Sequence, residues 1–254
     1  MIDKRFKGFD NFLFDLDGTL WLWTELLPRV DKVMKILEEL EKNIFFITNN
    51  CLLTRTGFAR KLQGFGIKTE KEKIINPTLA AIKLFKGKTV YCIGEGIVTE
   101  LRRAGVKVKE KANNVLVSDD RKITYDKLAR ACNLVEDGAK FYKTASGGIW
   151  VVKGKRLPGT GAIASVIELT IRKKAEVIGK PSKYMLNVLE SFKFNPAKTI
   201  LFGDECDSDI RTGNILNFKT ALVLTGKHKE RDYLMARGFE KPDILLRSVT
   251  NILK

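Results

Sequence analysis

Residues 11–19 read Asn-Phe-Leu-Phe-Asp-Leu-Asp-Gly-Thr, in which a short apolar run leads directly into two carboxylates and a glycine. A run of this length that ends at such a turn signal predicts a buried strand over residues 11–14. Asp15 and Asp17 then follow the carboxyl end of that strand. In open parallel sheets the carboxyl ends of the strands meet along one edge, where ligands bind. The stretch therefore predicts an α/β protein whose ligand site contains Asp15 and Asp17.

The same alternation of apolar runs and helical patterns continues along the chain and indicates a Rossmann-like parallel sheet with crossover helices. Strands are expected at residues 11–14, 44–47, 89–93, 115–117, 139–142, 149–152, 177–178, 199–202, 220–224 and 244–246. Helices are expected at residues 28–40, 55–65, 76–85, 98–104, 125–135, 161–171 and 183–192, with a short one near the C-terminus. No flexible linker marks a domain boundary, so a second domain would be an insertion with short connections.

The composition is that of a folded protein and restricts the available chemistry. Of the 254 residues, 44% are hydrophobic and 30% are charged. No apolar run approaches the roughly 20 residues that span a bilayer, and no signal-peptide core precedes Asp15, so we expect a cytoplasmic protein. The four cysteines lie far apart with no Cys-x-x-Cys pair, which argues against a zinc site and a disulfide scaffold. His228, the only histidine, lies in the polar run 226–231 and is expected to be exposed.

The chain is strongly basic, with 46 Lys and Arg against 30 Asp and Glu and a net charge of +16. The basic residues are spread along the whole sequence and form no tail. The simplest interpretation is a lysine-rich solvated surface. Two alternatives stay open, namely the steering of small anionic substrates and the binding of a nucleic acid.

Polar residues also follow three other expected strands. Thr48, Asn49 and Asn50 come after the strand at 44–47, and Lys180 comes after the strand at 177–178. Gly203-Asp204 begins an acidic segment, 203–209, after the strand at 199–202. If the four strands share one sheet, a single edge collects carboxylates, a hydroxyl, amides and a lysine. That mixture suits phosphoryl transfer with a magnesium ion.

Each of these side chains answers a chemical need of phosphate ester cleavage. Asp15 can attack phosphorus and form an acyl phosphate, while Mg²⁺ on Asp15 and Asp204 offsets the negative charge. Asp17 can protonate the leaving group and then activate water. The Asp-x-Asp-Gly pattern also occurs in calcium loops and plain turns. An EF-hand is disfavoured because position 19 is Thr and no acidic residue closes the loop.

The chain resembles the haloacid dehalogenase superfamily, whose four motifs read D-x-D-x-T, a strand-end Ser or Thr, a Lys, and G-D-x-x-x-x-D. Here they correspond to residues 15–19, Thr48, Lys180 and residues 203–209. The second aspartate, Asp17, is typical of the phosphatase members. The runs Thr48-Asn49-Asn50, 158–161 and 179–181 are similar to the p-nitrophenylphosphatase-like branch, subfamily IIA. The resemblance extends over nearly the whole chain.

The resemblance implies an architecture and a role for each matching residue. Residues 1–84 and 178–254 would form the core domain, and residues 85–177 an inserted α/β cap of the C2 type that selects the substrate. Asp15 would be the nucleophile and Asp17 the general acid and base. Mg²⁺ would be held by the Asp15 and Asp204 side chains and the Asp17 main-chain carbonyl, with Asp209 in support. Thr48 and Lys180 would complete the catalytic set. The implied phosphate- or substrate-binding residues are Gly18, Asn49, Asn50, Gly147 and Lys180.

The chain also departs from the family pattern. Relatives commonly carry T-N-x-D at a cap strand end, whereas this chain has Thr144-Ala145-Ser146-Gly147. The fourth motif carries Glu205 and Ser208 where Arg and Thr are usual. The substrates of relatives therefore do not predict the substrate of this chain. Trp21 and Trp23 either line the site or pack in the core.

The expected function is that of a Mg²⁺-dependent phosphatase acting on phosphoglycolate, glycerol phosphate, a sugar phosphate, p-nitrophenyl phosphate or a similar small phosphomonoester. The alternatives are a phospho-acceptor signalling domain, a phosphomutase and a nucleic-acid-binding protein that uses the basic surface. The expected partner is a small phosphate ester, rather than a membrane or a nucleic acid. Pairing as a homodimer through the cap is an open expectation from the relatives.

Overall fold

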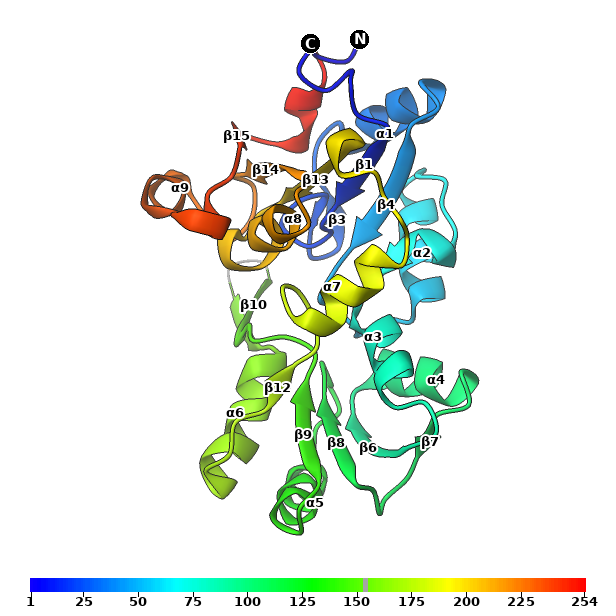
Figure 1. The fold of residues 1–254 in the computed structure, drawn as a ribbon, viewed down its shortest axis with the longest axis vertical. Helices are drawn as coiled ribbons and strands as arrows, with labels where there is room; N and C mark the ends of the chain where they lie inside the picture. The colour runs from blue at the N-terminus through cyan, green and yellow to red at the C-terminus, as the bar shows by residue number, and fades with distance from the viewer. Residues whose placement is uncertain (153–154) are drawn as a thin grey trace. The chain divides into compact units, whose positions relative to one another are not determined.

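In the computed structural model, which describes residues 1–152 and 155–254, the chain divides into two compact units. Unit 1 comprises residues 1–48, 55–75 and 186–254, and unit 2 comprises residues 49–54 and 76–185. Each unit is built around its own parallel sheet (Figure 1). Both the expected α/β class and the expected parallel pairing are therefore confirmed.

Unit 1 contains a six-stranded parallel sheet in which the first strand of the chain is an inner strand. The order is β15 (Ile244–Leu246), β14 (Lys219–Val223), β13 (Thr199–Gly203), β1 (Asn11–Phe14), β4 (Asn43–Ile47) and β5 (Ile74–Ile75). Phe14 pairs with Phe202 on one side and with Phe46 on the other. All three side chains are buried, and the Phe14 and Phe202 rings stack with centroids 4.9 Å apart. This register aligns the carboxyl ends of β1, β4 and β13.

The helices of unit 1 cover this sheet with amphipathic faces. In α1 (Val30–Glu39) the buried residues are Val30, Val33, Met34 and Leu37, a spacing that places them on one helix face. The others are α2 (Arg55–Gly64), α8 (Arg211–Ile215) and α9 (Glu230–Met235), and α7 (Lys183–Glu190) contains the boundary between the units. A π-helical turn, η3 (Cys206–Ile210), joins β13 to α8. A short antiparallel pair, β2 (Trp21–Leu22) and β3 (Glu25–Leu26), follows β1.

Unit 2 contains a five-stranded parallel sheet whose two faces are both buried. The order is β12 (Glu176–Val177), β9 (Lys140–Lys143), β8 (Asn114–Val117), β6 (Thr89–Ile93) and β7 (Lys107–Val108). Its helices are α3 (Pro77–Leu84), α4 (Glu95–Arg103), α5 (Tyr125–Glu136) and α6 (Thr160–Ile171), and it also carries the hairpin β10 (Ile149–Val152) and β11 (Lys155–Pro158). One core cluster contains Val115, Val117 and residues of α5 and α6; another contains Leu116 and residues of α3 and α4. Successive β8 side chains thus face opposite cores.

All the expected strands and helices occur among the described residues, most with bounds within two residues of the prediction. The short elements β2, β3, β5, β7, β11, α8 and α9 had no clear sequence pattern. One expectation is wrong. The strand at 177–178 is β12, which pairs with β9 in unit 2, so the four motif-bearing strands do not share one sheet. The short C-terminal helix is a 3₁₀ turn, η5 (Val249–Ile252).

Within the described part of the chain, no helix combines the length and the apolar character needed to cross a membrane.

Candidate active site

Three buried carboxylates come together at the carboxyl edge of the unit 1 sheet. One carboxylate oxygen from each of Asp15, Asp204 and Asp209 lies within 4.8 Å of the other two. Asp15 follows β1, and its N–H donates a hydrogen bond to the Phe202 carbonyl at 2.8 Å, which continues the parallel pairing past the strand. Asp204 follows β13, and the η3 turn brings Asp209 back to the same place. Buried oxygens gathered in this way are the donor set that Mg²⁺ prefers.

The backbone holds the Asp204 carboxylate in a tight space. The Lys227 N–H donates to Asp204 Oδ2 at 2.6 Å, and the His228 N–H donates to the Asp204 carbonyl at 3.1 Å. A Cβ atom at Gly226 would collide with the Asp204 carboxylate, and so would one at Gly18. Gly18 also has φ +87°, a conformation that favours glycine. Both glycines are therefore required by close packing against Asp204.

Asp209 is fixed by the loop it belongs to. The Glu205 N–H donates to Asp209 Oδ2 at 3.0 Å, and Gly203 has no room for a Cβ beside the Asp209 side chain. Burial raises the pKa of Glu205, with a smaller contribution from the Asp209 carboxylate, while Lys227 at 3.2 Å opposes the rise. The departure from the family pattern at position 205 thus places an additional, partly buried acid beside Asp209.

His228 is not exposed, contrary to the expectation from its polar surroundings. Its side chain is 18% exposed, and Nδ1 accepts a hydrogen bond from the Cys206 N–H at 2.9 Å. Together with the bond from its own N–H to Asp204, this ties the loop after β14 to the loop that carries Asp204 and Asp209. Sequence reasoning missed this role because the contacts are made across 22 residues.

Asp17 lies two residues past Asp15 in a tight turn closed by Trp21. The Trp21 indole N–H donates to Asp17 Oδ1 at 2.8 Å, and the Gly18 N–H donates to the Trp21 carbonyl at 2.8 Å. Trp21 is fully buried and belongs to the main core cluster of unit 1, whereas Trp23 is half-buried. Trp21 therefore packs in the core and also contacts a predicted site residue.

The second and third motifs divide between the units. Thr48, buried at the end of β4, belongs to unit 1, and its N–H donates to the Ile75 carbonyl at 3.0 Å. Asn49 and Lys180 belong to unit 2 and bind each other reciprocally. The Lys180 N–H donates to Asn49 Oδ1 at 2.7 Å, and Asn49 Nδ2 donates to the Lys180 carbonyl at 3.2 Å. Asn50 accepts a bond from the Leu52 N–H at 2.9 Å. The amide of Asn49 thus orients the backbone that carries Lys180.

The loop at 144–148 of unit 2 is attached to the start of α6. Thr144 is buried and donates to the Ser118 hydroxyl at 3.1 Å, while Gly147 is exposed and its carbonyl accepts the Gly161 N–H at 2.8 Å. Beside this loop, Asp119 Oδ1 accepts bonds from the Thr160 hydroxyl at 2.8 Å and the Trp150 indole at 3.1 Å. Sequence reasoning did not single out Asp119, although it is the second residue after β8, close to a strand end as Asp15 is.

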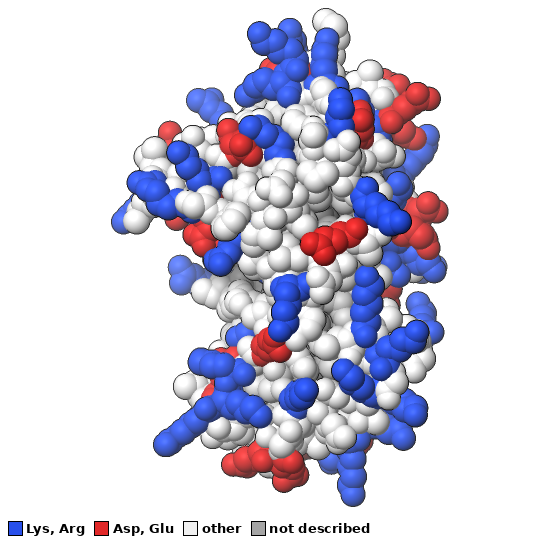
Figure 2. Space-filling model, in the orientation of Figure 1, with Lys and Arg blue, Asp and Glu red and all other residues white. Residues whose placement is uncertain are grey.

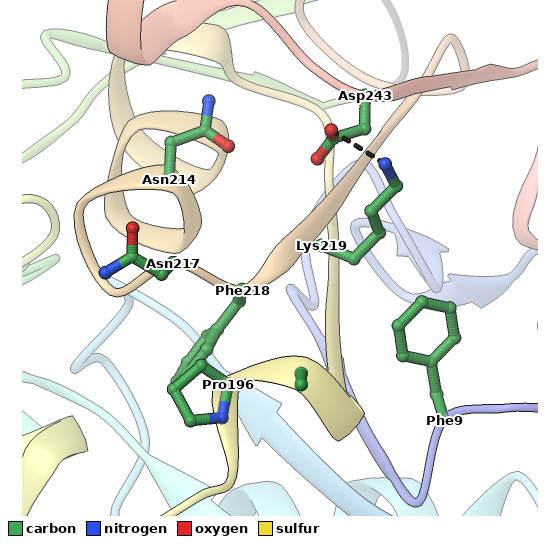
Figure 3. A pocket seen from close by; sticks show the side chains of 8 residues that line it. Phe9, Pro196, Asn214, Asn217, Phe218, Lys219 and Asp243 are labelled. Carbon is green, nitrogen blue, oxygen red and sulfur yellow. Dashed lines mark hydrogen bonds and ion pairs between the residues drawn. The ribbon is translucent and has the colours of Figure 1, made fainter.

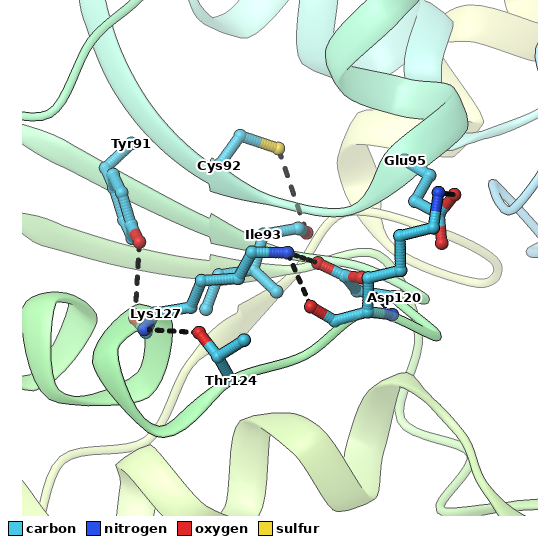
Figure 4. A network of polar contacts seen from close by, with 8 residues as sticks. Tyr91, Cys92, Ile93, Glu95, Asp120, Thr124 and Lys127 are labelled. Atoms are coloured by element: carbon cyan, nitrogen blue, oxygen red, sulfur yellow. Dashed lines mark hydrogen bonds and ion pairs between the residues drawn. The ribbon is translucent and has the colours of Figure 1, made fainter.

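The residue after Asp119 belongs to a second polar network of unit 2 (Figure 4). Asp120 accepts bonds from Lys127 Nζ and from the Lys122 N–H, both at 2.7 Å. The Tyr91 hydroxyl donates to the Lys127 carbonyl at 3.3 Å. The network links β6 and the segment after β8 to the first turns of α5, and both oxygens of Asp120 accept hydrogen bonds within it.

A pocket of about 480 Å³ lies at the opposite, amino edge of the unit 1 sheet (Figure 3). Its lining includes Phe9, Asn214, Phe218, Lys219 and Asp243. The polar groups of this pocket bind one another or neighbouring backbone. Lys219 pairs with Asp243 at 2.8 Å, and Asn214 Nδ2 donates to two carbonyls, those of Phe239 and Lys241. The pocket therefore offers few unsatisfied groups to a ligand, and the carboxylate cluster is the stronger candidate site.

The chain is similar in sequence and in fold to known hydrolases. A family described as haloacid dehalogenase-like hydrolase matches residues 12–107, and a related HAD-hydrolase-like family matches residues 177–252. A 4-nitrophenylphosphatase of Schizosaccharomyces pombe is 30% identical over 99% of this chain and 94% of its own length. Phosphoglycolate phosphatase 2 of Arabidopsis thaliana is 29% identical over 98% of this chain and 94% of its own length. The crystal structure of a single mutant of the thermostable NPPase from Geobacillus stearothermophilus aligns with a TM-score of 0.83 and 29% identity, covering 95% of this chain and 96% of that one.

Proposed function

The chain belongs to the haloacid dehalogenase-like hydrolases, and from this premise we propose that it is a Mg²⁺-dependent phosphatase of small phosphomonoesters. The observation that carries the proposal is the buried cluster of Asp15, Asp204 and Asp209, with Asp17 two residues away. Relatives named as phosphatases of nitrophenyl phosphate and phosphoglycolate support the same reaction class.

The donor set of unit 1 fits a magnesium ion. The carboxylates of Asp15 and Asp204 and the main-chain carbonyl of Asp17 would hold the ion, while Asp209 would support it from behind. Three like charges this close are costly to bury without a cation. When bound, Mg²⁺ supplies positive charge that offsets the carboxylates and the phosphate.

The residues of the chain then divide the reaction between them. The Asp15 carboxylate oxygen attacks phosphorus, and the bond from phosphorus to the leaving oxygen breaks as Asp17 donates a proton to that oxygen. This leaves a phosphoaspartate on Asp15. In the second step Asp17 takes a proton from water, whose oxygen attacks phosphorus. The bond from phosphorus to the Asp15 oxygen then breaks, which releases inorganic phosphate and restores the Asp15 carboxylate. A positioned acid and base of this kind contribute about 10²–10⁴-fold in rate.

The remaining motif residues would hold the phosphate and substrate. Thr48 and Lys180 would donate to the phosphoryl oxygens, and preorganised donors of this type stabilise the charge of the transition state. The hydrogen bonds between Asn49 and Lys180 support this role, because they orient the segment that carries the lysine. The further binding positions in this proposal are Gly18, Asn49, Asn50 and Gly147.

We propose that residues 85–177, which lie within unit 2, act as a cap between core segments 1–84 and 178–254 and select the substrate. The loop at 144–148 lacks the T-N-x-D pattern, so the relatives do not indicate which ester is preferred. Unit 2 contains 22 Lys and Arg against 10 Asp and Glu, a net charge of +12. This surplus favours an ester with a second anionic group, such as phosphoglycolate, over a neutral one.

The test measures phosphate release from phosphoglycolate, glycerol phosphate, sugar phosphates and p-nitrophenyl phosphate. Wild type and Asp15→Asn are compared with Mg²⁺ and with EDTA, and circular dichroism verifies that both are folded. We expect release that requires Mg²⁺ and falls by more than about 10⁴-fold in Asp15→Asn. A variant that keeps near-wild-type turnover would refute the phosphoaspartate mechanism.

The charge of unit 2 also favours a second candidate function, the binding of a polyanion such as a nucleic acid. On the drawn face of unit 2, Lys and Arg predominate and Asp and Glu form small groups (Figure 2). Retention on single-stranded or duplex DNA that weakens steeply with salt would support this function. Absence of retention at about 50 mM salt would exclude it.

A further inference from the structure

Trp21 makes a contact that core packing does not require. Its side chain is fully buried, yet its indole N–H donates a 2.8 Å hydrogen bond to one oxygen of Asp17, Oδ1. Building on the role proposed for Asp17 as general acid and base, we propose that Trp21 is a positioning residue. It determines which oxygen of Asp17 transfers the proton.

The turn around Asp17 makes Trp21 a rigid support. The N–H groups of Leu20 and Trp21 both donate to the Leu16 carbonyl, at 2.9 and 3.3 Å, and the Trp21 carbonyl accepts the Gly18 N–H. The indole packs against the Phe65 ring with centroids 6.0 Å apart. Because these contacts hold both the backbone and the ring of Trp21, the direction of its indole N–H group is fixed.

Lys61 of α2 strengthens this hydrogen bond from the other side. Its Nζ lies 3.9 Å from the centroid of the Trp21 ring and donates to the Trp23 carbonyl at 2.7 Å. A cation over the face of an indole draws electron density from the ring, which makes the N–H a better donor. The chain of contacts therefore runs from Lys61 through the Trp21 ring to Asp17.

The consequence follows from the structure of a carboxylic acid. When Asp17 is protonated, one oxygen carries the proton and the other remains a carbonyl acceptor. Because Trp21 donates to Oδ1, that oxygen is the acceptor and Oδ2 carries the proton. In the first step the Oδ2–H bond breaks, its proton goes to the leaving oxygen, and its electron pair stays on the carboxylate. In the second step a proton from water returns to Oδ2.

The experiment compares leaving groups, because a residue that merely packs would affect all substrates equally. p-Nitrophenolate leaves without a proton, whereas the alkoxide of glycerol phosphate requires one. The value of kcat/KM reports the steps up to formation of the phosphoaspartate, which include departure of the leaving group. The key variant replaces Trp21 by 3-benzothienylalanine, in which sulfur takes the place of the N–H group at nearly the same volume. Trp21→Phe is the simpler second variant.

We expect kcat/KM for glycerol phosphate to fall about tenfold in the benzothienylalanine variant. This loss is smaller than the whole contribution of general acid catalysis, which is about 10²–10⁴-fold. The value for p-nitrophenyl phosphate should stay within about twofold. Asp17→Asn should show the same split with a larger loss. Trp23→Phe, which removes a neighbouring indole and keeps its backbone carbonyl, should change neither substrate by more than about twofold.

Two results would overturn the inference. An equal loss on both substrates would show that Trp21 only packs, and unchanged values on both would show that the hydrogen bond has no effect. Failure of the proposed function gives a different result, because the wild-type protein itself would then release no phosphate from either ester or would show no split in Asp17→Asn. That result would contradict the role proposed for Asp17 and, with it, the role proposed for Trp21.

Discussion

Both parallel sheets have an inner strand that ends at a pair of aspartates, and the two pairs have different surroundings. In unit 1, β1 leads to Asp15, whose carboxylate lies among those of Asp204 and Asp209. In unit 2, β8 leads to Asp119 and Asp120, both of them buried. There the carboxylates accept hydrogen bonds from a hydroxyl, an indole and a lysine, those of Thr160, Trp150 and Lys127.

The comparison shows that the neighbouring groups decide whether a strand-end aspartate is a candidate metal ligand. Further carboxylates beside it favour that role, whereas hydrogen-bond donors beside it do not. In unit 1, β13 and η3 add two more carboxylates, so negative charge accumulates in a buried place. In unit 2, α5 and α6 add donors, so each carboxylate is satisfied within the fold. The buried carboxylate of Glu168 also has partners within the fold, because Lys143 and Lys174 lie at 2.8 and 3.0 Å from its oxygens. Unit 1 thus gathers three carboxylates at the edge where we propose that a cation binds, whereas Asp120 and Glu168 of unit 2 are paired with lysines.

The largest predicted effect comes from disturbing the carboxylate cluster through a glycine. The Cβ of Gly226→Ala would collide with the Asp204 carboxylate and force it out of place. We expect the Mg²⁺ concentration for half-maximal phosphatase activity to rise by roughly 100-fold, since displaced support of a ligand typically weakens metal binding this much. The measurement is a Mg²⁺ titration of phosphate release.

Gly64→Ala is the matched control for this variant. Gly64 is the last residue of α2, and a Cβ there would meet no atom within 4 Å. It should leave the Mg²⁺ requirement unchanged. A Gly226→Ala protein with the wild-type Mg²⁺ requirement would contradict the assignment of the cation to unit 1.

The sequence predicts the strands that lead to these aspartates better than it predicts which residues lie around them. The apolar runs at β1, β8 and β13 are long enough to mark buried strands, and Asp15 and Asp204 lie at strand ends as predicted. The sheet that each strand joins depends on contacts between distant residues. The wrong expectation for β12 illustrates this, because a two-residue strand carries no pattern that selects β9 as its partner.

The same limit applies to single side chains. His228 stands among charged residues in the sequence, and only the return of the chain after β14 brings it to Cys206 and Asp204. Asp119 is similar in sequence position to Asp15, and only the packing of Thr160 and Trp150 against it reveals the difference. The carboxylates of the site could be named from spacing, whereas the residues that hold them could not.

A second prediction concerns the neutralised acids of unit 2. The hydrogen bonds from Lys143 and Lys174 outweigh burial and lower the pKa of Glu168 to about 2. A folded-state pKa below the ordinary value of 4.5 contributes stability above about pH 4.5 that is lost as the pH falls toward about 2. Glu168→Gln should therefore destabilise the protein by about 3 kcal/mol at pH 7. The difference from wild type should shrink by more than half at pH 3.

Urea unfolding followed by circular dichroism at the two pH values measures this effect. Glu136→Gln in α5 is the control, because Glu136 is exposed and its replacement should cost less than about 0.5 kcal/mol. If the free energies of unfolding of Glu168→Gln and wild type differ by the same amount at pH 7 and at pH 3, the ion pairs of Glu168 do not stabilise the protein in the predicted way.

The smallest predicted effect tests whether the location of charge matters for substrate capture. Unit 2 carries a net +12, whereas unit 1 has 24 Lys and Arg against 20 Asp and Glu, a net +4. Reversing two exposed charges on β7 and after it, Lys107→Glu with Lys109→Glu, should lower kcat/KM for phosphoglycolate about threefold at low salt. The same charge change on α1, Lys32→Glu with Lys35→Glu, should lower it by less than about 1.5-fold. Added salt should reduce the difference between the two variants, because it screens exposed charges separated by more than about 10 Å. Equal losses would mean that only the total charge attracts the substrate, and that the positive surplus of unit 2 has no special part in its capture.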